Sequence, residues 1–414
     1  MKGDIIDSPS SHSLAPSVPI GDDAPAAERP IICFPFTGDV VGGNHISSLG
    51  LIKALDRGRF EPLVVLRHGD GPLAELLREQ QVEFEPGPAF DSFIPGRSVP
   101  ASQLIRHIGR VPALARYLRQ RHVTLVHVNS GRSAAAWGVA ARMAGANLVW
   151  HQRGNPAARG VRWIAPWLAD YIIAVSEFAR PTTWGPGRAP VKVVHNPFAT
   201  DRTEDRAACR KRLLRELGCP AHTALVGFFG ALIARKRPLL FVEAIAKLHE
   251  RRSSKPVIGL LVGEAYDGFD AAVDQRAAAL GISDCIRRVG FRHPSAPWLA
   301  GCDILAVPAH EEPFGRTLVE AMLLGTPVVA TRSGGNAEAI AHGVTGLLIP
   351  PDDSDAFAHA IAHLLSDHSL RRSIASAAKT EARSRYGRER HARAVMQIYD
   401  EILTPARPNG RATS

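Results

Sequence analysis

Two carboxylates in the stretch EEPFGRTLVEAMLLGTPVVATRSGG, residues 311–335, have a spacing that suits ligand binding. Glu312 lies in a loop after an apolar run, whereas Glu320 is about one turn into an apolar helix pattern that ends at Gly325. The first amides of a helix have no partner within it and favour an anion. The stretch therefore predicts one acid for sugar hydroxyls, an anion site, and a second acid for a ribose. The alternative is a solvated Glu312 and a simple ion pair at Glu320.

The amides suited to that anion belong to Gly315, Arg316 and Thr317. Two cations in another loop, Arg235 and Lys236, follow an apolar strand pattern and precede a helix pattern. Such a pair can neutralise a diphosphate, and an arginine can bind phosphate oxygens with two parallel bonds. A solvated basic turn is the alternative for this pair.

A second glycine-containing loop follows the first apolar run. Gly42 and Gly43 precede a helix pattern that begins near His45, so the backbone can approach a ligand and the helix amides can hold an anion. The loop is not GxGxxG, and no acidic residue stands where a nicotinamide ribose would need it. His151 ends another apolar run, where side chains reach a cleft. A tight turn and a structural histidine are the alternatives.

Short apolar runs that alternate with helix patterns would have to position these residues. The expected strands are 30–36, 62–68, 124–129, 147–152, 171–176, 224–230, 257–263, 285–291, 303–309 and 326–332. The expected helices are 44–56, 72–81, 102–120, 131–144, 238–251, 271–280, 316–324 and 354–366. Continuous apolar strands separated by helices predict parallel sheets covered on both faces, in a doubly wound α/β architecture.

A polar linker and a charged helix interrupt the strand patterns near residues 195–217, so we expect two Rossmann-like domains that face a central cleft. The expected order is a disordered tail, an N-terminal domain, a C-terminal domain, a final helix and a second tail, at 1–29, 30–197, 198–380, 381–403 and 404–414. A chain of 414 residues is also too long for one hydrophobic core.

The composition narrows the classes of partner and compartment. The formal net charge is +10, which favours anionic partners, but no zinc-finger spacing or RNA-binding aromatic signature accompanies it, so nucleic acid is not expected. No apolar run is long enough for a transmembrane helix, and the first 30 residues lack a secretory signal. The five scattered cysteines suggest reduced thiols in a cytoplasm rather than a metal site.

From about residue 30 to residue 400, the sequence resembles the retaining glycosyltransferases of family 4, which have the GT-B fold. The resemblance is carried by the E-x7-E motif EPFGRTLVE, by AMLLGTPVVATRSGGNAEAI and HGVTGLLIPPDD after it, and by YIIAVSEFAR and GALIARKRP before it. Such a long ordered match is more specific than any single loop.

The resemblance implies roles for the residues singled out above. Glu312 would contact the donor sugar, Glu320 the ribose, and Lys236 the phosphate. His151 would be the cleft histidine, and Gly43 the glycine of the loop over donor and acceptor. The expected catalytic residues are Glu312, Lys236 and His151, and the acceptor or phosphate loop holds Gly42, Gly43 and His45. The expected donor-binding residues are Arg235, Lys236, Glu312, Phe314, Gly315, Arg316, Thr317, Leu318 and Glu320.

Two positions depart from the family pattern. Ala231 stands where the family often has an arginine, and Arg235 is a candidate to supply the missing guanidinium. The usual Asn-Gly after the linker strand reads HNP at 195–197. A non-catalytic sugar-nucleotide-binding protein is therefore one alternative function, and a GT-B epimerase or hydrolase is another.

The expected reaction moves a sugar from a nucleotide-diphosphate sugar to an acceptor hydroxyl with retention, in surface-polysaccharide or lipid-linked glycan synthesis. The resemblance implies that the leaving phosphate takes the acceptor proton. Because no metal-binding Asp-x-Asp motif is evident, no metal or other cofactor is expected. The sequence leaves the donor, the acceptor and the oligomeric state open.

Residues 102–120 combine an apolar stripe with arginines on its flanks, including Arg106 and Arg110. A surface helix packed on the sheet is the preferred interpretation. A peripheral contact with the anionic cytoplasmic face of a membrane, close to a lipid-linked acceptor, is the alternative.

Overall fold

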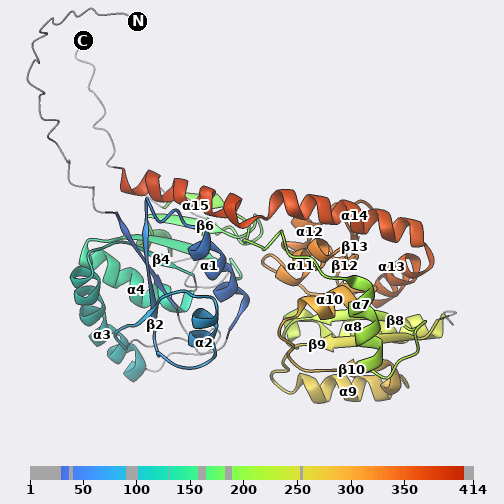
Figure 1. Cartoon of the computed structure of the whole chain (residues 1–414). Coiled ribbons are helices and arrows are strands. Elements are labelled where there is room, and N and C mark those ends of the chain that lie inside the picture. Colours follow the sequence, from blue (N-terminus) through green and yellow to red (C-terminus); the bar gives the residue numbers. More distant parts are fainter. Residues whose placement is uncertain are drawn as a thin grey trace, which may run out of the picture.

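The computed structural model of the chain describes residues 29–36, 41–89, 101–129, 131–156, 165–181, 189–251 and 255–404. The two predicted tails lie outside these ranges except for residues 29 and 404, and so does the start of the first glycine-containing loop, residues 37–40. The described residues form two α/β domains that lie side by side (Figure 1).

The N-terminal domain is a seven-stranded sheet covered by helices. Its strands are β1 Ile31–Pro35, β2 Glu61–Leu66, β3 Glu85–Pro86, β4 Val123–Val128, β5 Asn147–Gln152, β6 Tyr171–Ala174 and β7 Val191–Val193. Its helices are α1 Gly43–Ala54, α2 Pro72–Glu79, α3 Ala101–Gln120, α4 Gly131–Ala144 and α6 Ala165–Leu168. The short strands β3 and β7 are not predicted by the sequence, because runs of two and three residues show no clear apolar pattern.

The C-terminal domain has a six-stranded sheet. Its strands are β8 Ala224–Phe229, β9 Val257–Val262, β10 Ile286–Arg288, β11 Ile304–Val307, β12 Val328–Thr331 and β13 Leu347–Ile349. Its helices are α7 Arg206–Glu216, η1 Ala234–Lys236, α8 Pro238–Glu250, α9 Phe269–Ala279, η2 Ser283–Cys285, α10 Ala296–Gly301, α11 Arg316–Leu324, α12 Asn336–Ala339, α13 Ser354–Ser366 and α14 His368–Arg385. Strands β8 and β9 are buried at every position, so both faces of this sheet are covered.

All strand pairs in both sheets are parallel. In each sheet, the order in which successive strands are added reverses at one point. The orders are β3-β2-β1-β4-β5-β6-β7 and β10-β9-β8-β11-β12-β13, so the switch points lie between β1 and β4 and between β8 and β11. Ligands of doubly wound sheets bind outside the carboxyl ends of the strands at such points. The loops after β1, β4, β8 and β11 therefore define where a site is expected.

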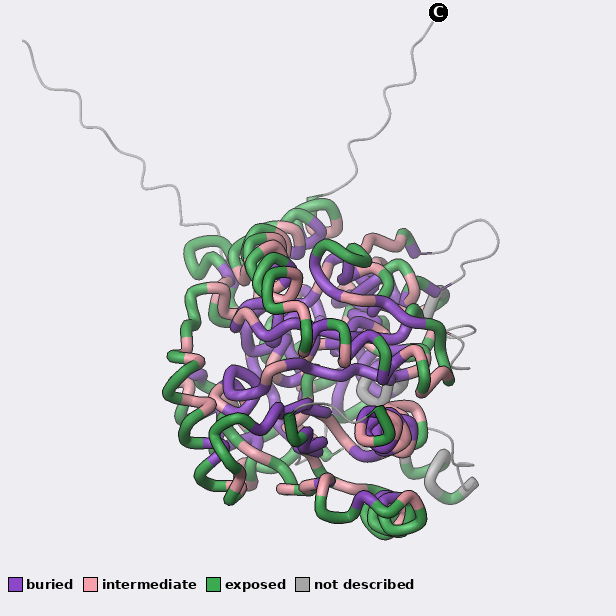
Figure 2. The backbone as a smooth tube through the Cα atoms, turned by 90° about the vertical axis from the view of Figure 1, so that its right-hand side faces the viewer, coloured by how far each residue is buried: buried purple, intermediate pink, exposed green. Residues whose placement is uncertain are grey.

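The buried core follows this layout, since buried backbone gathers in the sheets and the outer faces of the helices are exposed (Figure 2). Helix α15, Arg388–Leu403, belongs by sequence to the end of the chain but packs on the N-terminal domain, where Val395, Ile398 and Tyr399 join the core formed by β1 and α1. Figure 1 shows α14 lying along the C-terminal domain and α15 continuing over the N-terminal one.

The prediction of one helix over 381–403 is wrong, because α14 ends at Arg385 and α15 begins at Arg388. The break lies where the chain crosses between the domains. Gly387 is extended there, and Phe198 of the first crossing donates its amide hydrogen to the carbonyl of Tyr386 at 2.9 Å. The two crossings thus pair with each other, which an i,i+4 helix pattern cannot reveal.

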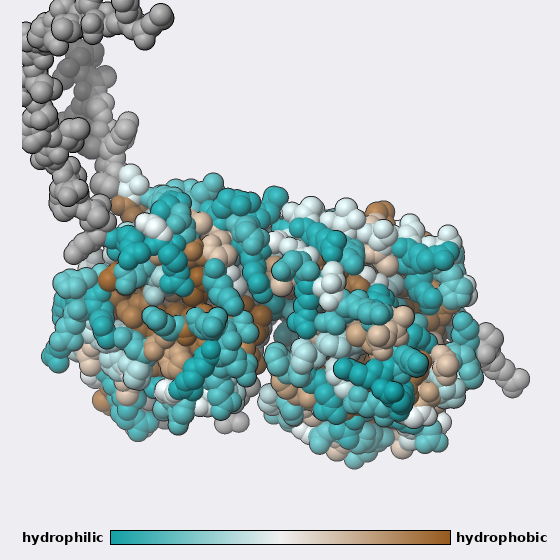
Figure 3. Space-filling view, in the orientation of Figure 1, coloured by the Kyte–Doolittle hydropathy of each residue, from teal (hydrophilic) through white to brown (hydrophobic). Residues whose placement is uncertain are grey.

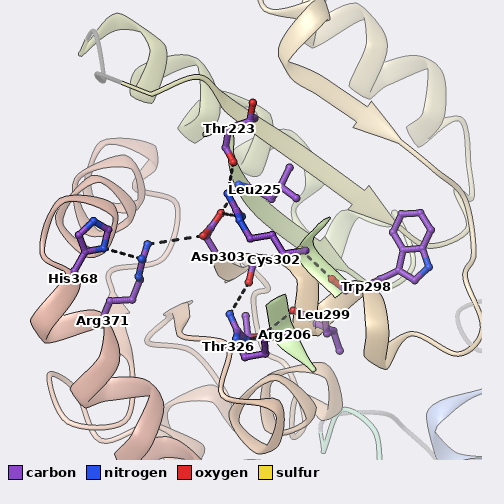
Figure 4. Close-up of polar contacts among 11 residues, drawn as sticks. Arg206, Thr223, Leu225, Trp298, Leu299, Cys302, Asp303, Thr326, His368 and Arg371 are labelled. Atoms are coloured by element: carbon purple, nitrogen blue, oxygen red, sulfur yellow. Dashed lines mark hydrogen bonds and ion pairs between the residues drawn. The ribbon is translucent and has the colours of Figure 1, made fainter. Parts of the chain in front are cut away.

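An ion-pair network holds α7 and α14 to the amino ends of the C-terminal strands (Figure 4). The carboxylate of Asp303, just before β11, pairs with Arg210 of α7 and accepts the amide hydrogen of Leu225 in β8 at 2.8 Å. Arg371 of α14 lies 4.0 Å from the other oxygen of that carboxylate. This network stabilises the amino ends of the strands, which lie opposite to the strand ends that face the N-terminal domain.

Candidate active site

Glu312 lies at the C-terminal switch point together with two cations. Its carboxylate is 2.9 Å from Nζ of Lys236 and also pairs with Arg235, and only 8% of the residue is exposed. Burial alone would raise the pKa of Glu312, but the charges and hydrogen bonds of Lys236 and Arg235 outweigh it and lower the pKa. The carboxylate is therefore held ionised between two cations.

The sequence brings these groups together through adjacent strand ends. Lys236 follows β8 in the turn η1, and Glu312 follows β11, the neighbour of β8. The SGG turn after β12 supports the Glu312 loop, because the amide of Gly335 donates to the carbonyl oxygen of Glu312 at 2.7 Å. A Cβ on Gly334, whose φ is 58°, would lie 2.4 Å from that oxygen, so only glycine fits there.

Helix α11 begins beside this cluster, and Gly315 caps it with a φ of 73°. The amides of Arg316 and Thr317 belong to the first turn, so they have no acceptor within the helix. The side chain of Arg316 turns toward the N-terminal domain, where Nη1 donates to Oγ of Ser47 at 2.8 Å, while Nη2 donates to Glu320 at 3.2 Å. Glu320 thus forms the ion pair that the alternative interpretation foresaw, although 30% of its side chain is exposed and accessible to a ligand.

Two predicted donor-binding residues do not line the site with their side chains. Phe314 is buried in an aromatic cluster at the domain crossings, stacked on His195 at 5.2 Å and edge-on to Tyr386 at 5.5 Å. Leu318 is fully buried in the core of the C-terminal domain, and its amide already donates to the carbonyl of Gly315 at 3.1 Å. Both side chains are therefore part of the buried core.

The glycine-containing loop of the N-terminal domain meets helix α11 of the other domain. A Cβ on Gly43 would lie 2.9 Å from Cδ of Arg316, so the backbone of this loop approaches the start of α11 closely. Gly42 caps α1, and its amide donates to Nδ1 of the buried His45 at 3.0 Å. The predicted acceptor loop and the predicted anion-binding helix therefore face each other across the domain boundary.

The prediction that His151 reaches the cleft is wrong, because its side chain is 0% exposed. It faces α15 and stacks on His391 with 5.7 Å between ring centroids. Its Nδ1 is 3.1 Å from Nε2 of His127, and Nδ1 of His127 contacts the hydroxyl of Tyr399 at 2.6 Å. Strand alternation explains the direction, since Trp150 and Gln152 point to the opposite side. His151 has a place in the packing of α15 and no contact surface for a ligand.

Arg153 is the functional candidate that the sequence reasoning passed over. It directly follows β5, and its guanidinium donates to Oδ1 of Asn129 from Nε at 3.3 Å and from Nη2 at 3.1 Å. It also donates to Oδ1 of Asn196, the asparagine of the HNP sequence, and to Nδ1 of His151. Asn129 is the last residue of one predicted strand and Arg153 directly follows another, so the rule about strand ends could have found them.

The space-filling view shows the surface hollowed between the two domains (Figure 3). Polar contacts also cross the boundary, since both oxygens of Glu338 accept backbone amide hydrogens, from Glu177 at 2.8 Å and from Phe178 at 2.7 Å. The part of the chain that the structure describes contains no group of three or more His, Cys, Asp or Glu side chains placed to hold a metal ion. No helix among the described residues is long and apolar enough to cross a membrane.

Fold and site together define a two-domain α/β protein in which two cations, a buried carboxylate and a helix amino end gather at the boundary between the domains. Residues 41–202 match the family described as Glycosyltransferase Family 4, and residues 223–367 match the family described as Glycosyl transferases group 1. The chain belongs to the glycosyltransferases of family 4 with the GT-B fold, which confirms the predicted family and fold class.

Similar proteins carry related names. The chain is 35% identical over 213 residues to the D-inositol 3-phosphate glycosyltransferase of Corynebacterium jeikeium strain K411, covering 50% of this chain and 49% of that protein. The protein of the same name from Frankia alni is 33% identical over 228 residues, which cover 53% and 55% of the two chains. The chain thus spans about half the length of the curated relatives it matches.

Solved structures extend the similarity over almost the whole fold. The crystal structure of Anabaena HepE in complex with UDP-glucose has a TM-score of 0.75 and 26% identity, over 90% of this chain and 99% of that one. Sucrose-phosphate synthase from Thermosynechococcus elongatus has a TM-score of 0.71 over 91% and 100% of the chains, and its 20% identity supports the fold alone.

Proposed function

We propose that the chain transfers a sugar from a nucleotide-diphosphate sugar to an acceptor hydroxyl, with retention at the anomeric carbon. One observation carries the proposal: Lys236, Arg235 and the amino end of α11 converge beside the buried, ionised Glu312 at the switch point of the C-terminal sheet. Such a site suits a diphosphate with a sugar at one end. The complex of the similar HepE with UDP-glucose supports a uridine nucleotide as the first donor to test.

Departure of the nucleoside diphosphate builds up negative charge. We assign its stabilisation to Lys236, Arg235 and the amides of Arg316 and Thr317, because preorganised donors in a partly buried site act strongly on developing charge. Glu312 would accept hydrogen bonds from sugar hydroxyls and would exchange its bonds with the two cations for bonds to the ligand. The leaving phosphate would take the proton of the acceptor hydroxyl, so no protein base is assigned. With the charge neutralised by side chains, the proposed reaction needs no metal.

The test is a thermal-shift panel of UDP-, GDP- and ADP-sugars, followed by a transfer assay with the nucleotide sugar that binds and with EDTA present. We expect Lys236→Ala to lower transfer by about 10²-fold to 10³-fold, the usual effect of removing one donor to a developing charge. Lys247→Ala is the matched control, since Lys247 lies on α8 and pairs with Asp355. Transfer by Lys236→Ala at the wild-type rate would overturn the mechanism.

The same panel separates the alternatives. Turnover of the nucleotide sugar without an acceptor would indicate a hydrolase or epimerase, and tight binding without turnover on any acceptor would indicate a binding protein. We propose a role in the synthesis of a surface polysaccharide or lipid-linked glycan on the cytoplasmic side. The five cysteines are unpaired, which supports a reducing compartment.

A peripheral contact with an anionic membrane is a second proposal, supported by the first half of α3. Ile105 is 71% exposed and Ile108 is 61% exposed, and Arg106 beside them is exposed as well. The second half of the same stripe, which includes Leu114 and Leu118, is buried in the core and supports nothing beyond packing. Flotation with liposomes that contain acidic lipid should carry the wild type and lose Ile105→Ser. Equal flotation with neutral lipid would remove the electrostatic part of this proposal.

A further inference from the structure

The carboxyl edge of the N-terminal sheet carries an arginine that no carboxylate accompanies. Arg153 is held by the oxygens of Asn129 and Asn196 and by a ring nitrogen of His151, all of them uncharged. Among the ion pairs of the described residues, none involves Arg153. A partly buried cation without a counter-ion costs stability, so its presence calls for a reason.

The positive charge of Arg316 adds to the excess of positive charge around Arg153. Burial, and then the positive charge of Arg316, lower the pKa of Arg153 to about 9. Arg316 itself has one carboxylate partner, Glu320. Of these two guanidinium groups, which lie where the strand ends, the loop of Gly43 and the start of α11 meet, only that of Arg316 has a carboxylate partner.

The hydrogen bonds of Arg153 fix its orientation and leave a donor free. A guanidinium has five N–H groups. Nε donates to Asn129, Nη2 donates to Asn129 and His151, and Nη1 donates once to Asn196, so the contacts of the described residues leave one N–H on Nη1. Because a guanidinium only donates, Nδ1 of His151 is an acceptor, and it also accepts from Nε2 of His127.

We propose that Arg153 recognises a phosphate group on the acceptor, which makes it a specificity-determining residue of the acceptor site. The inference rests on the proposed transferase function and names the class of its acceptor. Arg153 lies at the strand ends of the N-terminal domain, across the boundary from the cations assigned to the donor diphosphate. An arginine held in a fixed plane suits phosphate geometry, and the missing counter-ion is supplied when the ligand binds.

The test uses inorganic phosphate as the probe, titrated by calorimetry into the full chain saturated with the nucleoside diphosphate found in the panel above. Saturation keeps phosphate out of the donor site. We expect phosphate to bind the wild type and to bind Arg153→Gln at least about tenfold more weakly, since a hydrogen bond to a charged group is of that size. Competition by inositol 3-phosphate or by vesicles with phosphatidic acid tells a soluble phosphate from a lipid headgroup.

A second variant keeps the proposal testable if Arg153→Gln fails to fold. Asn129→Asp keeps the shape of the side chain and places a carboxylate against Nε and Nη2 of Arg153. It should raise the melting temperature and lower phosphate affinity at least about tenfold, because the counter-ion is then built in. Asn147→Asp is the matched control, since it adds the same charge at the opposite end of β5.

The outcomes are distinct. If Asn129→Asp raises the melting temperature but leaves phosphate affinity unchanged, Arg153 is only structural and the inference is overturned. The same holds if the wild type binds nucleoside diphosphate but no phosphate. If no nucleoside diphosphate or nucleotide sugar binds at all, the proposed function fails first, and the inference falls with it.

Discussion

Single side chains decide which charges face the domain boundary. Glu312 is ionised because two cations outweigh the effect of its burial, and the backbone of the SGG turn fixes its loop. In the structure the three charges satisfy one another, so the ligand must replace part of these bonds when it binds. The proposed site is thus assembled before a ligand binds, which is the condition for the electrostatic stabilisation of a leaving group that we propose.

Replacing Glu312 by glutamine should separate its charge from its shape. We expect Glu312→Gln to lower kcat/KM for the nucleotide sugar by about 10²-fold, because the amide cannot hold both cations in place and accept as strongly from sugar hydroxyls. Initial rates at several donor concentrations measure it. Glu311→Gln is the control, since the neighbouring carboxylate is exposed and its contact is with Asn155 at 3.4 Å. A loss of similar size in both variants would contradict a specific role for Glu312.

Among the elements, α15 depends on histidines that must stay neutral. Burial, and then the charge of Arg153, lower the pKa of His391 to about 3, and the pKa values of His127 and His151 are also lowered, first by burial. The unfolded chain takes up protons near the ordinary value of 6.5, whereas the folded chain does not. Stability is therefore complete above about pH 6.5 and falls as the pH drops toward 3.

The expected loss from His391 alone is about 1.4 kcal/mol per pH unit in that window. Urea unfolding at pH 7.5, 6.5 and 5.5 measures it. The variant His391→Asn, which keeps a donor for the carbonyl of His195, should have a shallower slope by about that amount. His222→Asn, an exposed position, should keep the slope of the wild type. Equal slopes in all three proteins would refute the linkage.

The network around Asp303 makes a second prediction about elements. Asp303→Ala removes the partner of Arg210 and the acceptor of the Leu225 amide, in a place where only 16% of the carboxylate side chain is exposed. We expect a loss of about 2–3 kcal/mol in the free energy of unfolding, because two partners stay behind with unmet bonds. Asp274→Ala breaks an exposed pair with Arg288 and should cost less than about 1 kcal/mol. Chemical denaturation compares the two, and similar losses would contradict the role of burial.

The elements also mark how far the sequence could predict the structure. Long apolar strands such as β8 and β9 and the helix that starts at Arg316 follow directly from hydrophobic pattern, and they place Lys236 and Glu312 together once the strand order is known. The direction of a side chain is a different matter. Whether His151 faces a ligand or a helix depends on α15, which lies some 240 residues later in the chain. The same holds for Phe314, whose partners come from both domain crossings.

At the scale of the whole molecule, contacts between described residues of the two domains bear on how closely the domains approach. The chain crosses twice between them, near Phe198 and near Gly387, and these crossings are paired. Beyond the crossings, Glu338 holds the turn after β6, and Oγ of Ser176 donates to the carbonyl of Pro313 in the Glu312 loop. Because of these contacts, the position of the Glu312 loop depends on how closely the two domains approach each other. Because a hinge consists of a few loop or element-terminal residues, we expect the two crossings to act as one.

Removing the contacts of Glu338 with the turn after β6 should therefore let the two domains separate and should also weaken donor binding. Glu338→Ala deletes an acceptor for two amides, which is worth about 2 kcal/mol and shifts the ratio of closed to open forms roughly thirtyfold. We expect a larger radius of gyration by small-angle scattering without ligand, a higher KM for the nucleotide sugar, and recovery of the compact form at saturating nucleoside diphosphate. Glu243→Ala is the control, since its pair with Arg276 joins α8 to α9 within the C-terminal domain. A raised KM without any change in the scattering would mean that Glu338 acts on the loop alone and that the domains do not close around it.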